Sequence, residues 1–327
     1  MTSKALWLFS ACTVLTVTAA TAQTPARTYT PPRTADGQPD LQGVWLSNTA
    51  TPLERPKALE GRARLTDAEV AEFRRRADRL FRSGNSDFAV GDGVYQAVLA
   101  NPATYRNPNA THSAAEMVDL EFDNRTSLVV DPADGRLPPA TDAGRARQQA
   151  AAAAFAQPAG AADTGNAFRC ISWGVPRLGG RYGAGDLSYY EIVQAPGYVV
   201  ISAEAGHEAR VIPIDGRPHL RSGIRQWNGD SRGRWDGNTL VVETTNFSPK
   251  SFFMGATDNL HVVERFTRTA SDRIEHVITV TDPTTWTRPW TAMMPLRGRQ
   301  EPLFEYACHE GNYHQVAGVV LGARAAR

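Results

Sequence analysis

The stretch WNGDSRGRWDGNTLVVETTNF, residues 227–247, is the part of the sequence that decides the fold. It contains Asp236-Gly237 between two strand-like segments, and an Asp-Gly pair in this setting is a strong signal for a two-residue β-hairpin turn. The apolar run at 240–242 has the composition of a strand that packs against a core. The stretch therefore predicts an antiparallel hairpin whose first strand is rich in charged residues.

Two registers are open for this hairpin. If Asp236-Gly237 forms the turn, Asp230 lies opposite Glu243, and one face of the hairpin carries two carboxylates beside two guanidinium groups. A three-residue turn shifts the pairing by one position, places Ser231 opposite Glu243 and separates the two carboxylates. We favour the first register, in which the charged face is either a functional site or a structural ladder of ion pairs.

Short strands with turn signals continue through the C-terminal half of the chain. They recur at intervals of about ten residues, a spacing typical of an antiparallel barrel or sandwich. The segments expected to form these strands are YYEIVQAPGYVVISAE (189–204), RVIPI (210–214), NTLVVETTNF (238–247), NLHVVERFTR (259–268), RIEHVITV (273–280) and YHQVAGVVL (313–321). The predicted fold class is therefore mainly β, an antiparallel barrel or sandwich.

The N-terminal half adds helices to this β fold. Residues 65–81 form the clearest helical pattern, because Thr66 and Glu69 make a capping box and apolar residues recur on one face. An alanine-rich segment further on begins as a second helix and decays into a flexible connection. We therefore expect one β-rich domain over residues 41–327, with a helical insertion in the N-terminal half at about 60–160.

The N-terminus has the pattern of a secretory signal peptide. Residues 1–22 combine Lys4, an apolar run too short to span a membrane and a final A-x-A pattern, so cleavage is expected after Ala22. Residues 23–40 are rich in Pro and Thr and predict an extended lead-in. These features predict a periplasmic or secreted protein without a stable membrane span after cleavage.

Composition and missing motifs narrow the partners and the reaction classes. The net formal charge is +1 and the sequence has no basic patch with interleaved aromatic residues, which argues against nucleic acid as a partner. The letters G-x-S-x-G occur at residues 229–233, GDSRG, but inside the predicted hairpin strand rather than at a strand-to-helix elbow, and the sequence lacks the Walker A and H-E-x-x-H motifs and a strand-linked G-x-G-x-x-G. Serine-hydrolase, nucleotide, zincin and dinucleotide-binding classes are therefore disfavoured.

Two cysteines, Cys170 and Cys308, remain after the signal peptide. In an oxidising compartment they form a disulfide that ties the start of the C-terminal half to its end. A pair of buried free thiols is the alternative.

The loop before the hairpin supplies the first catalytic candidate. His219 follows the turn-forming segment Asp215-Gly216-Arg217, and a histidine at the mouth of a β domain is a fair general acid or base. Asp230 is expected to orient or partner His219, and Arg217 or Arg232 to stabilise developing negative charge. The alternative is a surface histidine hydrogen-bonded to its own turn.

Strand alternation singles out two further polar residues. In residues 259–268 the period of two places Val262, Glu264 and Phe266 on one face, so Glu264 is expected among hydrophobic side chains. A buried glutamate needs a partner, and Glu264 is therefore either a functional acid or the anchor of a buried ion pair. His276 alternates with isoleucine and valine and is better explained as a hydrogen-bonded core histidine.

The segment YACHEGNYH, residues 306–314, concentrates polar groups near the C-terminus. His309 and Glu310 form a candidate acid–base pair. A metal would need at least three converging ligands, such as His219, His309 and His314, and no H-x-x-x-H spacing on a helix supports one. We therefore expect no metal and no organic cofactor.

The order of several motifs resembles a large group of secreted bacterial proteins, most of them uncharacterised. The motifs that carry the resemblance are PDLQGVW, RTSLVVDPADGRLPP, RVIPIDGRPH, WNGDSRGRWDGNTLVVETTNF, VVERFTR, TDPTTWTRPW and FEYACHEGNY. The resemblance covers nearly the whole chain after the signal peptide and implies a β-rich, calycin-like (lipocalin-like) domain without a settled activity. Asp236 and Asn238 stand at turn positions where similar proteins have Glu and Asp, so neither is expected to be catalytic.

These features predict a cell-envelope enzyme that uses general acid–base chemistry, of the lyase, isomerase or hydrolase type. Its substrate would be a small, partly apolar molecule in a β-barrel-like pocket. The alternative is a protein that binds a small ligand without catalysis. The candidate catalytic residues are His219, Asp230, His309 and Glu310. The candidate substrate-binding residues are Arg217, Trp227, Arg232, Glu243, Glu264 and Asn312.

Overall fold

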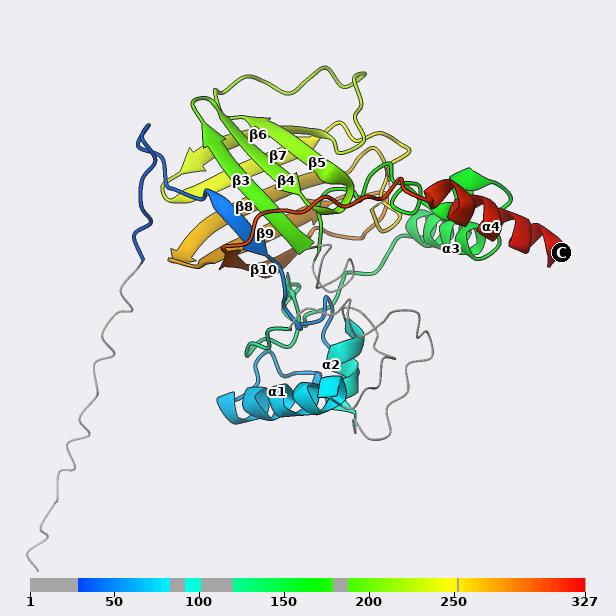
Figure 1. Ribbon diagram of the computed structural model, residues 1–327, viewed down its shortest axis with the longest axis horizontal. Helices are drawn as coiled ribbons and strands as arrows, with labels where there is room; N and C mark the ends of the chain where they lie inside the picture. Colours follow the sequence, from blue (N-terminus) through cyan, green and yellow to red (C-terminus); the bar gives the residue numbers. More distant parts are fainter. Residues whose placement is uncertain (1–28, 83–91, 101–119, 179–187, 252, 327) are drawn as a thin grey trace, which may run out of the picture.

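One antiparallel sheet curves into a nearly closed barrel and forms the body of the protein (Figure 1). The computed structural model describes residues 29–82, 92–100, 120–178, 188–251 and 253–326. In spatial order the barrel strands are β5 (Glu208–Pro213), β4 (Tyr198–Ala203), β3 (Tyr189–Ala195), β1 (Gly43–Leu46), β10 (Trp290–Arg299), β9 (Arg273–Thr281), β8 (His261–Ala270), β7 (Thr239–Thr245) and β6 (Asp230–Asp236). The barrel confirms the predicted fold class.

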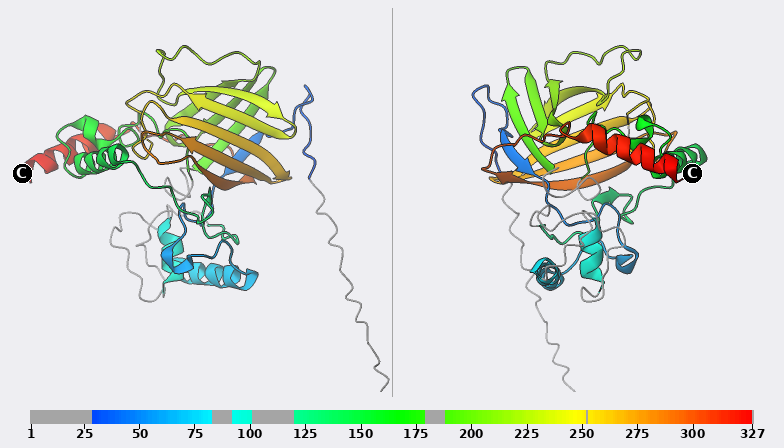
Figure 2. Two further views of the ribbon diagram at one scale, coloured as in Figure 1. Left: turned by 180° about the vertical axis from the view of Figure 1, so that it is seen from behind. Right: turned by 45° about the vertical axis from the view of Figure 1, so that its right-hand side comes forward.

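The strands form two facing walls. Figure 2 shows β7 to β10, in yellow to orange, in front of the green strands β3 to β5. A further short strand, β2 (Val129–Asp131), pairs with β10 outside the barrel order. β10 was not among the predicted strands. Its buried and half-buried residues alternate through Pro295, a residue type that usually argues against a central strand.

The barrel closes where β5 approaches β6, the two ends of the hydrogen-bonded order. At this point β6 carries Gly233, and a Cβ there would lie 2.7 Å from the Ile214 Cγ2 and 3.0 Å from the Ile212 Cγ2. Cβ atoms essentially never come within 3.0 Å of such neighbours. Gly233 therefore allows the two strands to come close enough to close the barrel.

The hairpin of β6 and β7 has a register that differs from both alternatives. Asp236 pairs with Thr239, so the two-residue turn is Gly237-Asn238. Gly237 has φ +60°, a left-handed conformation that two-residue hairpin turns require at their first central position. Both predicted registers were wrong, because Asp236 belongs to the strand and the turn begins at the glycine.

The observed register changes the cross-strand partners of the charged residues. Asp230 lies opposite Thr245, and Arg232 lies opposite Glu243. The pairing differs from the favoured register by two positions, and a shift of two keeps every side chain on its face. Asp230, Arg232 and Glu243 therefore still share one face, which is the outer face of the barrel.

The inside of the barrel holds two apolar clusters that meet along β8. Val262 belongs to one cluster and Phe266 to the other. Glu264 lies between them on the same inward face, as the period of two predicts, and is only 2% exposed. A carboxylate therefore stands in the middle of the apolar interior.

The helices of the N-terminal half have a small core of their own below the barrel (Figure 1). They are α1 (Asp67–Arg82) and α2 (Asp92–Leu99). The predicted capping box is confirmed, since the Thr66 N–H donates to Glu69 and the Glu69 N–H donates to the Thr66 hydroxyl. The described residues of this half also include the short 3₁₀ helices η1 (Lys57–Leu59) and η3 (Ala161–Thr164).

Two further helices, α3 (Asp142–Ala156) and α4 (Asn312–Ala325), lie beyond one end of the barrel. Thr141 is the N-cap of α3, and its hydroxyl accepts a hydrogen bond from the Gly144 N–H. α4 lies at the C-terminal end of the described chain. Residues 313–321 were predicted as a strand and lie within α4, so that prediction is wrong. The helix satisfies the backbone hydrogen bonds of this segment internally, without a partner strand.

A disulfide joins Cys170 to Cys308, with their Cα atoms 5.8 Å apart. It decides between the two states that the sequence left open. It also ties the loop before β3 to the segment that follows β10, and so links regions that are 138 residues apart in the chain.

The predicted signal peptide, residues 1–22, lies outside the described residues. Of the predicted lead-in, residues 29–40 are described, and a β-bridge joins Arg33 to Pro39 around a turn. Within the described ranges, every helix is too short or too polar to cross a membrane.

Candidate functional site

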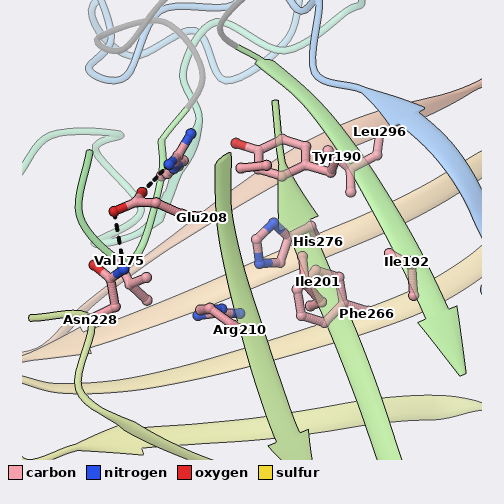
Figure 3. A pocket seen from close by; sticks show the side chains of 12 residues that line it. Val175, Tyr190, Ile192, Ile201, Glu208, Arg210, Asn228, Phe266, His276 and Leu296 are labelled. Atoms are coloured by element: carbon pink, nitrogen blue, oxygen red, sulfur yellow. Dashed lines mark hydrogen bonds and ion pairs between the residues drawn. The ribbon is translucent and has the colours of Figure 1, made fainter. Parts of the chain in front are cut away.

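A cavity opens into the barrel between its two walls (Figure 3). We call it the lumen. The space between its side chains is about 520 Å³, which includes open solvent at the mouth. Its lining is largely apolar, a composition typical of small-molecule sites. The lining residues are Val175, Arg177, Tyr190, Ile192, Ile201, Ala203, Glu208, Arg210, Asn228, Phe266, His276 and Leu296.

Glu264 is buried in the lumen wall between two nitrogen-bearing partners. Arg210 Nη1 donates to Glu264 Oε2 at 2.6 Å, and His276 Nε2 lies 3.1 Å from Glu264 Oε1. His276 also stacks on Phe266, with ring centroids 4.1 Å apart, which holds its imidazole in place. Arg210, Glu264 and His276 form what we call the polar layer of the lumen, and the expected buried ion pair of Glu264 is present.

The environment moves the pKa values of two residues in opposite directions: Glu264, which is buried behind the lumen lining, and Tyr190, which is part of it. Burial alone would raise the pKa of Glu264, but the charge of Arg210 and the hydrogen bond to His276 outweigh it and lower this pKa to about 2. Burial raises the pKa of Tyr190 above its ordinary value. At neutral pH the lumen therefore contains an ionised carboxylate, which is a weak base, and a protonated phenol.

Glu208 organises the mouth of the lumen. It accepts a hydrogen bond from Asn228 Nδ2 at 3.1 Å and others from the Trp173 N–H at 3.2 Å, and it forms an ion pair with Arg177. The Ser172 hydroxyl donates to Asn228 Oδ1 at 2.7 Å. These contacts join β5, the loop before β3 and the loop before β6 at one point (Figure 3).

A second group of polar residues lies on the outer face of the hairpin. His219 Nδ1 is 3.0 Å from Asp230 Oδ2, and the Leu220 N–H donates to the same oxygen at 2.9 Å. Arg232 Nη1 donates to Asp230 Oδ1 at 2.6 Å. Asp230 is only 4% exposed and is fixed by these contacts. Its carboxylate therefore holds the His219 imidazole in place. The structure thus brings together His219, Asp230 and Arg232, as the sequence led us to expect.

Glu243 extends this group across the next two strands. Its Oε1 lies 2.7 Å from His261 Nε2, and its Oε2 lies 4.0 Å from His219 Nε2. We call His219, Asp230, Arg232, Glu243 and His261 the outer-wall cluster. It alternates carboxylates and imidazoles on the outside of the barrel, whereas the lumen lies on the opposite face of the same sheet.

The other loop residues predicted for the site lie away from both groups. Arg217 is exposed and forms an ion pair with Asp215, which lowers the pKa of that carboxyl to about 2. Trp227 is 40% exposed and lines a separate small pocket together with Phe247 and Leu260. Arg217 therefore braces its own turn, and Trp227 packs beside the lumen mouth rather than inside it.

The C-terminal candidates form no constellation with the hairpin. His309 and Glu310 are exposed in the turn before α4, and Asn312 is the first residue of that helix. In the part of the chain that the structure describes, neither His309 nor Glu310 makes a polar contact with His219 or Asp230. The four candidate catalytic residues therefore do not share one hydrogen-bonded site.

Several lumen residues were missed by the sequence reasoning. Arg210 alternates with the buried Ile212 in β5, and Tyr190 alternates with the buried Ile192 in β3. The period of two, applied to these segments, would have placed both side chains inward. Arg177 stands in a loop, where no local pattern marks it.

Comparisons with known proteins add little to this geometry. No protein-family model and no curated protein sequence matches the chain. Among solved structures, it is similar to a secretary abundant heat soluble (SAHS) protein from Ramazzottius varieornatus, at 12% identity and a TM-score of 0.24. That match covers 34% of this chain and 70% of the other. The resemblance to secreted bacterial proteins therefore stays a prediction.

Among the residues that the structure describes, no group of three or more His, Cys, Asp or Glu side chains is arranged to hold a metal ion.

Proposed function

We propose that the protein binds a small, mainly apolar molecule in the lumen. The observation that carries this proposal is the lumen itself, a cavity within a barrel whose apolar lining includes a few hydrogen-bonding side chains. Cavities of this composition are the usual form of small-molecule sites. The polar layer would orient the ligand, because Arg210 and Glu264 hold each other in fixed positions.

Binding fits the lumen better than acid–base catalysis does. Glu264 is ionised and engaged by two partners, and its pKa of about 2 makes it a poor acceptor of a substrate proton near neutral pH. Tyr190 also keeps its proton near neutral pH, because burial raises its pKa. These groups can donate and accept hydrogen bonds, which is what selective binding requires.

The proposal is tested by blocking the lumen with a matched pair of variants. Ala203 lines the lumen at the end of β4, and Ala209 is exposed on the neighbouring β5. The protein is purified from cells, unfolded, and its released small molecules are identified by mass spectrometry. We expect one compound from the wild type and from Ala209→Leu, and its loss from Ala203→Leu. Equal amounts of that compound from both variants would place the ligand elsewhere.

A second candidate function is acid–base catalysis at the outer wall. The observation that favours it is the His219–Asp230 pair, in which a buried carboxylate orients an imidazole in the manner of a general acid or base. This second function has the reaction type predicted from the sequence, but its site is on the outside of the barrel. The alternative role of this pair is to hold the loop before β6 against the barrel wall.

Conversion of a bound compound separates catalysis from binding. The compound recovered from the lumen is incubated with the wild type, with His219→Asn and with Arg234→Gln, an exposed neighbour on β6. Catalysis predicts a product of changed mass or structure with the wild type and with Arg234→Gln, and none with His219→Asn. Return of the unchanged compound from the wild type would show that this compound is not a substrate of the outer wall and leave the binding function intact.

We also propose that the protein acts in the cell envelope. The predicted signal peptide and the Cys170–Cys308 disulfide support an oxidising compartment. Sequencing the N-terminus of the protein exported from a bacterial host tests this proposal. The expected first residue is Gln23, and a retained Met1 would contradict it.

A further inference from the structure

One lining residue of the lumen has a buried hydrogen-bond donor that is unpaired within the described part of the chain. Arg177 lines the lumen and is 9% exposed. Its Nη2 donates to the Ala205 carbonyl at 3.0 Å and to Glu208, while its Nη1 is buried without a hydrogen-bond partner among the described residues. An unpaired buried donor on a charged group destabilises the protein, because it has lost its hydrogen bonds to water without replacement. An acceptor atom that reaches Nη1 would remove this destabilisation.

Arg177 is held so that its free N–H cannot easily turn towards another group that the structure describes. Glu208, which holds Nη2, is itself fixed by Asn228 and by the Trp173 N–H. Trp173 packs on Gly206, where a Cβ would lie 2.7 Å from the Trp173 Cδ1. The donor is therefore preorganised, and a preorganised donor recognises a ligand at little cost in lost side-chain freedom.

The charge of the lumen favours a neutral acceptor over an anion. Two arginines, Arg177 and Arg210, are already matched by Glu208 and Glu264 through ion pairs. An anionic ligand would leave one uncompensated negative charge in a largely apolar cavity, which is strongly unfavourable. A carbonyl, ester or ether oxygen accepts the same hydrogen bond without adding charge.

The rest of the lining defines the body of such a ligand. Ile192, Ile201, Phe266 and Leu296 face the same space as the phenol of Tyr190 (Figure 3). The space open to the centre of a water-sized molecule is about 40 Å³, so the lumen suits a compact compound rather than a long chain. Tyr190 keeps its proton and provides a second donor along the wall.

We infer that the lumen selects compact, apolar, uncharged molecules that carry a carbonyl-type oxygen, and that Arg177 recognises this oxygen through Nη1. Arg177 is thus the residue that determines specificity. This inference rests on the proposed binding function, which by itself requires only that an apolar molecule occupies the lumen.

Three probes of similar shape separate the two ideas. Binding of acetophenone, ethylbenzene and benzoate is measured by saturation-transfer NMR and calorimetric titration. For the wild type we expect acetophenone to bind about tenfold more tightly than ethylbenzene, the gain of one hydrogen bond to a charged donor. Benzoate should bind more weakly than acetophenone. Competition for one site is confirmed by loss of all binding in Ala203→Leu.

Variants of Arg177 assign the preference to this side chain. Arg177→Lys keeps a positive charge beside Glu208 but removes the second N–H branch, and it should abolish the preference for acetophenone while ethylbenzene binds as before. Arg217→Lys, an exposed arginine outside the lumen, should retain the tenfold preference. Circular dichroism and thermal unfolding verify that both variants are folded. If Arg177→Lys does not fold, Arg177→Gln replaces it with the same expectation.

Each outcome has a definite meaning. Equal binding of acetophenone and ethylbenzene to the wild type, or a preference that survives in Arg177→Lys, would overturn the inference and leave the binding function standing. If benzoate bound most tightly of the three probes, the inference that the lumen selects uncharged ligands would be wrong. Absence of binding by all three probes would overturn both the inference and the binding function for ligands of this size.

Discussion

At the scale of single residues, the buried charges are intelligible only through their partners. Glu264 and Asp230 are 2% and 4% exposed, and each makes contacts with both an arginine and a histidine. Isolated ionised carboxylates are very costly to bury, and such pairing offsets that cost. Glu264 lies on the inner face of the sheet and Asp230 on its outer face. The same pairing of a buried carboxylate with an arginine and a histidine therefore occurs on both faces.

Replacing Glu264 by Gln should destabilise the protein strongly. Arg210 would then be a buried charge without a counter-charge, and removal of one member of a buried pair costs about 3–5 kcal/mol. Urea unfolding monitored by tryptophan fluorescence gives the free energy of unfolding. Removing both charges in Arg210→Met/Glu264→Leu should cost less than Glu264→Gln alone, and a larger cost for the double variant would contradict this explanation.

The depressed pKa of Glu264 predicts the pH range of its contribution. Its folded pKa is about 2 against an ordinary value of 4.5, so the unfolded chain takes up this proton first as the pH falls. The stabilisation is therefore complete above pH 4.5 and is lost between pH 4.5 and about 2. Unfolding free energies measured from pH 6 to 2 should show this loss in the wild type and a shallower dependence in Arg210→Met/Glu264→Leu.

Replacing Asp230 by Ala should cost about 2 kcal/mol, because the Leu220 N–H and His219 lose a buried acceptor. Arg232 retains its hydrogen bond to the Ser231 carbonyl, which limits the effect. Arg234→Ala on the same strand is the control and should change stability by less than about 0.5 kcal/mol. Thermal unfolding distinguishes the two, and equal effects would show that the outer-wall cluster adds no stability.

At the scale of elements, the hairpin of β6 and β7 supplies both the outer-wall cluster and the seam of the barrel. Its outward residues meet the loop before β6, and its inward Gly233 meets β5. The two-residue periodicity of a strand makes this division of faces unavoidable once the register is set. Closure of the barrel and construction of the cluster therefore depend on the same seven-residue strand.

Gly233→Ala should weaken the barrel seam. The new Cβ would meet the Cγ2 methyl groups of Ile212 and Ile214, which are attached directly to Cβ and cannot swing away without moving the backbone. Overpacking of this kind costs about 1–3 kcal/mol. Gly223→Ala is the control, because no atom lies within 4 Å of its Cβ. Unchanged stability of Gly233→Ala would mean that β5 and β6 can separate freely.

At the scale of the whole molecule, the C-terminal segment straps across the mouth of the barrel. The Phe304 N–H donates to Glu204 and the Tyr306 N–H donates to His207 Nε2, both next to η6 (Ala205–His207). The Cys170–Cys308 disulfide anchors this strap two residues further on. Three distant parts of the chain thus converge where the lumen opens.

Removing the disulfide should lower stability and loosen the lumen mouth. A bridge across 138 residues restricts the unfolded chain, and its loss typically costs about 2–4 kcal/mol. Cys170→Ala/Cys308→Ala and the reduced wild type should show the same decrease in melting temperature. Hydrogen exchange at Tyr306 should also accelerate in both. An unchanged melting temperature after verified reduction would show that the strap is held by its other contacts.

Local patterns predicted those features whose cause is local. The capping box at Thr66, the inward side of Glu264 and the strand segments that alternate all follow from neighbours within a few residues. The strand predicted at 313–321 failed because an apolar β-branched run is also compatible with a helix when no partner strand is available. The hairpin register failed because Asp-Gly and Gly-Asn turns are both acceptable locally.

The sequence by itself determined which faces of the strands are buried and where the charged face of the hairpin lies. Only the tertiary structure decided that His219 meets Asp230 outside the barrel, and that Arg177 meets Glu208 inside it. The physical reason is that periodicity specifies the side to which a residue points, whereas its partner depends on how distant strands close into a barrel. Arg177 belongs to a loop with no pattern at all, and its place in the lumen follows from closure alone.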